Sequence, residues 1–256
     1  MLRDPPQAPA RLRLPELDAL RGLAVLLMVI YHTAFDLQYF YGWGIDIFAG
    51  GWWILARTSA ILFLLIAGIC ATISWERTSW RKILRRFAVL ASAATLVSFT
   101  TWLIAPQDFV KFGILHLFAF ATLLLPLFAP LKYWNGLLGI LAILIPTIPT
   151  VLTIHTIPTL PTPIAIILGF PPPSFSSLDY FPLLPWFGVM LIGLSLGHAL
   201  YIGNHSWRRS RERETRNEQL AAPLALLGRH SLLIYLRHQP ILLALLFLLL
   251  KPPSSY

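Results

Sequence analysis

The sequence predicts an all-α membrane protein, a bundle of about seven membrane-spanning helices. Of its 256 residues, 57% are hydrophobic and only 12% are charged, whereas a soluble domain is roughly half apolar and a quarter charged. The mean hydropathy is +0.69. The apolar residues gather into runs of about 20, the length that a helix needs to cross a bilayer. We therefore expect the lipid bilayer to surround most of the chain.

The basic residues predict the topology and argue against a nucleic-acid partner. The formal net charge is +9, but fifteen of the twenty Lys and Arg residues fall in short segments that can share one side of the membrane. Positive charge marks the cytoplasmic side, so we predict an N-terminus inside and a C-terminus outside. Lys111 and Lys251 are the two that fall in outside segments. No nucleic-acid-binding motif is recognisable.

The predicted organisation is a cytoplasmic tail over residues 1–16, one membrane domain over residues 17–251 and a C-terminal tail over residues 252–256. The first apolar run lacks a small-residue cleavage site and contains ionisable residues, so we interpret it as an uncleaved span. The seven predicted spans cover about residues 17–40, 52–74, 84–104, 112–130, 134–152, 182–201 and 229–250.

Residues 153–181 are predicted to form an outside loop, with a possible re-entrant segment over residues 157–173. The apolar run in this proline-rich stretch, Ile164–Phe170, is too short to cross a bilayer. A full crossing would also place the five arginines of residues 208–216 outside, which the rule for basic residues disfavours.

The first span contains the strongest candidate for a functional site. Arg21, His32 and Asp36 interrupt an otherwise apolar run, and ionisable groups inside a membrane normally face a protein interior or a wet cavity. Arg21 and His32 are eleven positions apart, which puts them on one helix face about 16 Å from each other. Asp36 shares that face, because it follows His32 by four positions. We predict that His32 and Asp36 are catalytic.

Ionisable residues in later segments extend the predicted site. We predict that His116 is also catalytic, although a histidine near a helix end is an open alternative. Arg57, Asp179 and His238 are predicted to bind a substrate, and a structural role for Arg57, paired with Asp36 or Asp46, is an open alternative. Arg21, Arg85 and Arg86 are predicted to bind the phosphates of a cosubstrate that comes from the cytoplasm, since a guanidinium group pairs well with phosphate. For Arg85 and Arg86, a role in setting the membrane topology is an open alternative.

Five motifs resemble those of one family of membrane acetyltransferases. They are RGLAVLLMVIYH with the following FDL, RTSAILFLLIAGICA, FGILHLFA, DYFPLLPWFGV and LGRHSLLIYLRHQP. The chain resembles bacterial membrane proteins related to the catalytic domain of heparan-α-glucosaminide N-acetyltransferase. The resemblance implies a multi-span protein of the bacterial cytoplasmic (inner) membrane. Its implied reaction moves an acyl group, here expected to be acetyl, from acyl-CoA to oxygen or nitrogen of a sugar or glycan.

Several alternatives remain open at the level of sequence. His32 acts as a general base towards the acceptor, with Asp36 fixing its tautomer, or it becomes acylated itself. The competing function is a proton-coupled transporter that uses His32, Asp36, His116 and His238 as a relay. A third hypothesis is a non-enzymatic membrane component, and a homodimer is a further open partner. No metal cofactor is predicted.

Overall fold

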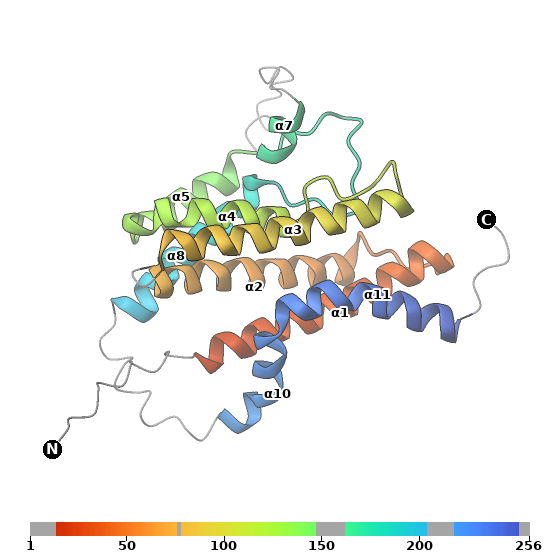
Figure 1. Cartoon of the computed structure of the whole chain (residues 1–256), viewed down its shortest axis with the longest axis horizontal. Helices are drawn as coiled ribbons and strands as arrows, with labels where there is room; N and C mark the ends of the chain where they lie inside the picture. Colours follow the sequence, from red (N-terminus) through yellow and green to blue (C-terminus); the bar gives the residue numbers. More distant parts are fainter. Residues whose placement is uncertain (1–13, 76–77, 147–161, 204–217, 251–256) are drawn as a thin grey trace. The chain divides into compact units, whose positions relative to one another are not determined.

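The computed structural model describes residues 14–75, 78–146, 162–203 and 218–250. These residues form nine α-helices (Figure 1), which confirms the all-α class. The helices are α1 (Pro15–Tyr41), α2 (Gly50–Ser74), α3 (Trp80–Ile104), α4 (Ile114–Phe128), α5 (Trp134–Leu144), α7 (Thr162–Leu168), α8 (Leu183–Gly197), α10 (Glu218–Arg229) and α11 (Ser231–Leu249). The 3-10 helix η2 (Ala129–Leu131) follows α4, and the π-helix η3 (His198–Ile202) follows α8.

Six of the described helices are long and apolar enough to cross a membrane, so the chain is a multi-pass membrane protein. They are α1, α2, α3, α4 with η2, α8 with η3, and α11. The predicted fifth span at residues 134–152 corresponds to the shorter apolar helix α5, and its last residues, 147–152, lie outside the described part. A seventh span therefore stays a prediction, as does the inside–outside topology.

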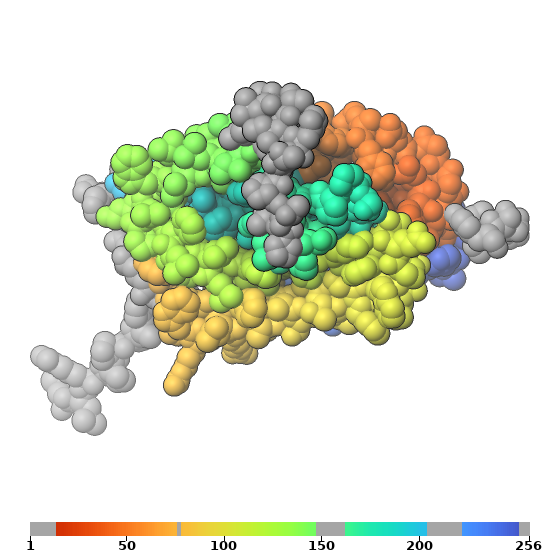
Figure 2. Space-filling view, turned by 90° about the horizontal axis from the view of Figure 1, so that it is seen from above, coloured from red at the N-terminus to blue at the C-terminus, as the bar shows by residue number. Residues whose placement is uncertain are grey.

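The region predicted to be re-entrant contains the short helix α7. This helix has seven residues, too few to cross a bilayer at 1.5 Å per residue. Residues 157–161 of the predicted segment lie outside the described part. In the view of Figure 2, α7 and the residues after it lie on the surface, with α5 on one side and α3 on the other. Entry of this segment into the membrane remains a prediction.

The described helices divide between two compact units. Unit 1 comprises Met1–Ser59 and Glu214–Tyr256, and unit 2 comprises Ala60–Arg213. In unit 1, α1 packs along α10 and also contacts α11. Two glycines permit the close approach of α1 and α10. A Cβ atom on Gly22 would lie 1.9 Å from the carbonyl oxygen of Leu224, and one on Gly228 would lie 1.8 Å from that of Asp18.

The limits of α1 follow from its sequence. Pro15 occupies the first turn, where its missing N–H costs no helical hydrogen bond. The helix ends at Gly42, which has φ +64° and bonds back to the last turn, a left-handed cap that glycine favours. The first part of α2 is tied to the middle of α1, because the hydroxyl of Ser59 donates to the carbonyl oxygen of Ala24 at 2.9 Å.

Unit 2 is built on α8, which packs against both α5 and the end of α2. A Cβ atom on Gly139 of α5 would lie 2.6 Å from the carbonyl oxygen of Gly188. On its other side, α8 accepts a hydrogen bond at the carbonyl oxygen of Leu194 from the hydroxyl of Thr72, at 2.9 Å. Small residues at membrane helix interfaces allow such close backbone contact. The helices α3 and α4 pack together in the same unit.

Candidate functional site

Two histidines meet between α1 and α11 in unit 1. The rings of His32 and His238 lie edge to face, with centroids 4.8 Å apart and planes inclined by 71°. His238 is only 7% exposed, and Asp36 is completely buried. The structure thus brings together three of the residues that the sequence singled out, from the first and last membrane helices.

Backbone carbonyls hold both imidazoles in a defined orientation. Nδ1 of His32 lies 2.9 Å from the carbonyl oxygen of Met28, and Nδ1 of His238 lies 2.7 Å from that of Tyr235. A carbonyl can only accept, so each neutral ring has its hydrogen on Nδ1 and a lone pair on Nε2. Nε2 is therefore the basic atom of both histidines.

Asp36 pairs with a residue that the sequence analysis missed. Its Oδ1 accepts a hydrogen bond from Nε2 of Gln239, the residue after His238. The carbonyl oxygen of Met28, rather than Asp36, orients His32, so the prediction that Asp36 fixes this tautomer was wrong. A polar amide within an apolar span was the signal in the sequence that pointed to Gln239.

Three polar atoms of this cluster are buried without a hydrogen-bond partner among the described residues. They are Oδ2 of Asp36, Oε1 of Gln239 and Nε2 of His238. Leaving a buried acceptor unpaired costs about 1–3 kcal/mol, and more when the group is charged. We call His32, Asp36, His238 and Gln239 the acceptor cluster, because their unpaired atoms accept hydrogen bonds. Buried polar groups without a partner are typical of places where a protein binds a ligand or carries out a reaction.

Arg21 lies at the other end of the same helix and forms an ion pair. Its Nη1 is 2.9 Å from Oδ1 of Asp18, and Nε of Arg229 is 3.7 Å from the other carboxylate oxygen. The acidic partner offsets part of the positive charge that we predicted would bind phosphate. Glu16 lies in the same first turn of α1, so two acidic and two basic side chains share this end of unit 1.

His116 serves the start of α4 in unit 2. Its Nδ1 accepts a hydrogen bond from the backbone N–H of Gly113 at 3.2 Å, so its hydrogen is on Nε2. That atom lies 3.4 Å from Oγ of Ser98, whose own hydrogen is donated to the carbonyl oxygen of Val110 at 2.6 Å. Both ring nitrogens are engaged, which favours the structural alternative for His116 and leaves no lone pair for a base.

Asp179 caps the same helix from a distant loop. Its Oδ2 accepts a hydrogen bond from the backbone N–H of Ile114 at 2.9 Å, where a carboxylate also interacts favourably with the helix dipole. Burial of the carboxyl group raises its pKa to about 6, and the bond from Ile114 offsets only part of that rise. This geometry gives Asp179 a structural task, and its contact with substrate stays a prediction.

The remaining predicted arginines are exposed. The guanidinium of Arg57 lies over the ring of Trp53, 5.6 Å from its centroid. Arg85 and Arg86 follow each other on α3, and both are exposed. Arg86 lines a cavity of about 310 Å³ between α2, α3 and α4 in unit 2, together with small side chains such as Cys70, Ser74 and Thr122.

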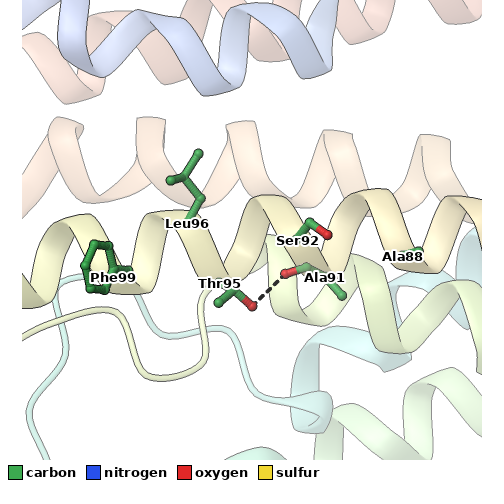
Figure 3. Close-up of a pocket in the computed structure, with 6 residues that line it drawn as sticks. All are labelled: Ala88, Ala91, Ser92, Thr95, Leu96 and Phe99. Atoms are coloured by element: carbon green, nitrogen blue, oxygen red, sulfur yellow. Dashed lines mark hydrogen bonds between the residues drawn. The ribbon is translucent and has the colours of Figure 1, made fainter.

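A second hollow on unit 2 is a shallow groove along α3 (Figure 3). It is lined by Ala88, Ala91, Ser92, Thr95, Leu96 and Phe99. The hydroxyl of Thr95 donates to the carbonyl oxygen of Ala91 at 2.9 Å, within the helix. All lining residues come from one helix and none is charged, so this groove offers no acidic or basic side chain. The described part of the chain also has no group of three or more His, Cys, Asp or Glu residues that could hold a metal ion.

Comparison with known proteins connects these observations to a family. The model of the family described as heparan-alpha-glucosaminide N-acetyltransferase, catalytic, matches residues 13–240. The matched region includes every residue of the acceptor cluster. A comparison with curated proteins found no match, and neither did a comparison with solved structures.

Proposed function

The chain belongs to the family of heparan-alpha-glucosaminide N-acetyltransferase catalytic domains, and from that premise we propose that it moves an acetyl group from acetyl-CoA to a sugar or glycan in the bacterial inner membrane. The family is one of membrane acetyltransferases that use acetyl-CoA. The observation that carries the proposal is the oriented pair of His32 and His238 inside the acceptor cluster. Buried groups with free lone pairs are what proton transfer from a nucleophile requires.

His32 is the general base in this proposal. Its Nε2 accepts the proton from an O–H or N–H group of the sugar while that oxygen or nitrogen bonds to the thioester carbonyl carbon. The C–S bond then breaks, and the imidazolium returns the proton to the departing thiolate of coenzyme A. Met28 keeps Nε2 available throughout, because its carbonyl oxygen holds the hydrogen on Nδ1.

Arg86 is our candidate for binding the phosphates of the donor. It is the one charged residue among the described residues that line the cavity between α2, α3 and α4. The small side chains around it leave a narrow space, which fits a slender arm such as pantetheine. Arg21 with Arg229 is the second candidate, and Arg85 contributes positive charge beside Arg86.

A proton relay through His32, Asp36, His116 and His238 is the competing function. Three of its members belong to the acceptor cluster, but His116 has both nitrogens engaged in its own unit. Proton-driven uptake of a solute into liposomes without acyl-CoA would favour the relay over acetyl transfer.

The decisive experiment measures transfer of radiolabelled acetyl from acetyl-CoA to glucosamine and to glucose by the purified protein in liposomes. We expect His32→Ala to lower the rate by about a hundredfold or more, the usual contribution of a general base. His230→Ala is the matched control, because this exposed histidine precedes α11. Unchanged transfer by a folded His32→Ala protein would overturn the proposal.

A further inference from the structure

The unpaired atoms of the acceptor cluster share one chemical property, which is that all of them accept hydrogen bonds. Gln239 donates through its NH₂ group to Asp36, so its Oε1 is the carbonyl oxygen. Nε2 of His238 has a lone pair, because Nδ1 donates to the carbonyl oxygen of Tyr235. When Asp36 is ionised, its Oδ2 also only accepts hydrogen bonds. Each of the three is buried without a partner among the described residues.

The positions of these atoms depend on Gln239. Asp36 is completely buried, and its described hydrogen-bond partner is the amide of Gln239. This bond connects α1 to α11 and uses Oδ1, whereas Oδ2 has no partner among the described residues. A buried carboxylate needs more than one neutral donor to be well stabilised. A group that only accepts cannot supply what is missing, whereas a group that donates several hydrogen bonds can.

We propose that Asp36, His238 and Gln239 form the subsite that holds the acceptor substrate by its hydrogen-bond donors, with Gln239 as the positioning residue. This inference rests on the proposed function, in which His32 then removes a proton from the held group. A held ammonium first gives one proton to water, which frees the nitrogen lone pair that attacks, and His32 takes the second proton. The ligand chemistry is a group with several donors at one place, which an ammonium or adjacent hydroxyl groups of a sugar supply. An acceptor without such donors would leave the three atoms unpaired and be rejected, since unpaired buried polar groups discriminate strongly.

The test uses a variant that keeps the size of Gln239 but removes its hydrogen bonds, Gln239→Met. We expect the KM for the acceptor to rise about tenfold while the KM for acetyl-CoA changes less than about twofold. Gln38→Met on α1 is the matched control, because Gln38 lies two positions from Asp36 and so on another helix face. Glucosamine and glucose serve as separate probes: a rise in KM for glucosamine alone identifies the ammonium as the donor, and a rise for both identifies hydroxyl groups. Equal KM values in wild type and Gln239→Met for both probes would overturn the proposal.

A second variant distinguishes a positioning role from a purely structural one. Asp36→Asn combined with Gln239→Glu exchanges the carboxylate and the amide between the two helices and preserves their pairing. We expect this protein to bind the acceptor probes more tightly than either single variant. If Gln239→Met does not fold, the exchanged pair decides: folding with acceptor binding supports the subsite, and folding without it overturns the subsite.

Acceptor binding is also measured by calorimetry without acetyl-CoA, so that the outcome does not depend on catalysis. Binding that is lost in Gln239→Met but present in wild type supports the subsite even if wild type transfers no acetyl group, a result that would remove only the proposed function. Transfer by wild type with unchanged acceptor binding in Gln239→Met would remove only the subsite.

Discussion

The histidines of the two units have opposite surroundings. In unit 1, His32 and His238 each use one nitrogen to bond a backbone carbonyl, and Nε2 of His238 is buried without a described partner. In unit 2, His116 uses both nitrogens, one towards Gly113 and one towards Ser98. The sequence places all three in or beside apolar spans and does not separate them. The difference lies in the second ring nitrogen. A histidine whose second nitrogen has no partner is a candidate for chemistry, and one whose second nitrogen is hydrogen-bonded supports the fold, whatever its position along the span.

The supporting interactions differ in the same way. In unit 1, α1 packs closely along α10, and the acceptor cluster joins α1 to α11 through two pairs of side chains, His32 with His238 and Asp36 with Gln239. The start of α4 in unit 2 is instead held by a network of hydrogen bonds from His116 and Asp179. We therefore expect overpacking to lower the free energy of unfolding most in unit 1. Polar substitutions should change stability in unit 2 and activity in unit 1.

The largest effect is expected from Gly22→Ala. Its Cβ atom would lie 1.9 Å from the carbonyl oxygen of Leu224, so the two helices must separate. We expect the free energy of unfolding to fall by about 3 kcal/mol, the upper end for overpacking, together with loss of activity. Gly51→Ala in α2 is the control, because it meets no atom within 4 Å. Equal thermal midpoints for both variants would contradict the described packing.

His116→Ala should affect stability without affecting chemistry. Removing the ring leaves the buried N–H of Gly113 unpaired, which should lower the free energy of unfolding by about 1–3 kcal/mol. Acetyl transfer per folded molecule should stay within about twofold of wild type. The measurement pairs chemical denaturation with the transfer assay. His32→Ala is the comparison, because it should lose transfer without losing stability. Loss of transfer by a stable His116→Ala protein would restore His116 as a catalytic residue.

Arg86→Gln should weaken donor binding moderately. We expect the KM for acetyl-CoA to rise about tenfold, or about 1.4 kcal/mol, when a guanidinium that binds phosphate is replaced by an amide. Arg81→Gln is the control, since Arg81 is exposed on the same helix but does not line the cavity. A rise of the same size in both variants would mean that general positive charge, rather than the cavity, attracts the donor.

The smallest effect is expected from Asp179→Asn, and it depends on pH. Because the folded protein raises the pKa of Asp179 from 3.8 to about 6, the fold favours the protonated carboxyl. Its contribution to stability is therefore complete below about pH 4 and is lost as the pH rises through about 6. Asparagine removes this decline while keeping an oxygen that accepts from Ile114. Thermal midpoints measured between pH 4 and pH 7 test this. Asp46→Asn, at an exposed position, is the control and should show the same decline with pH as the wild type.

Local properties of the sequence predicted much of the fold and the first candidates of the site. Hydropathy over about 20 residues identified the six span-length helices, because the cost of burying backbone in lipid depends on the segment itself. The shared face of His32 and Asp36 follows from helical periodicity alone. The family was also recognisable, since its motifs lie in single helices and the loops beside them.

The tertiary structure decided which polar groups are satisfied. Asp36 and Gln239 are 203 positions apart, so no local pattern predicted their hydrogen bond. The structural role of Asp179 likewise depends on Ile114, 65 positions away. Whether a polar atom finds a hydrogen-bond partner depends on which helices pack together. The sequence therefore determined where ionisable groups enter the membrane, and the packing of distant helices determined which of them keep a free lone pair.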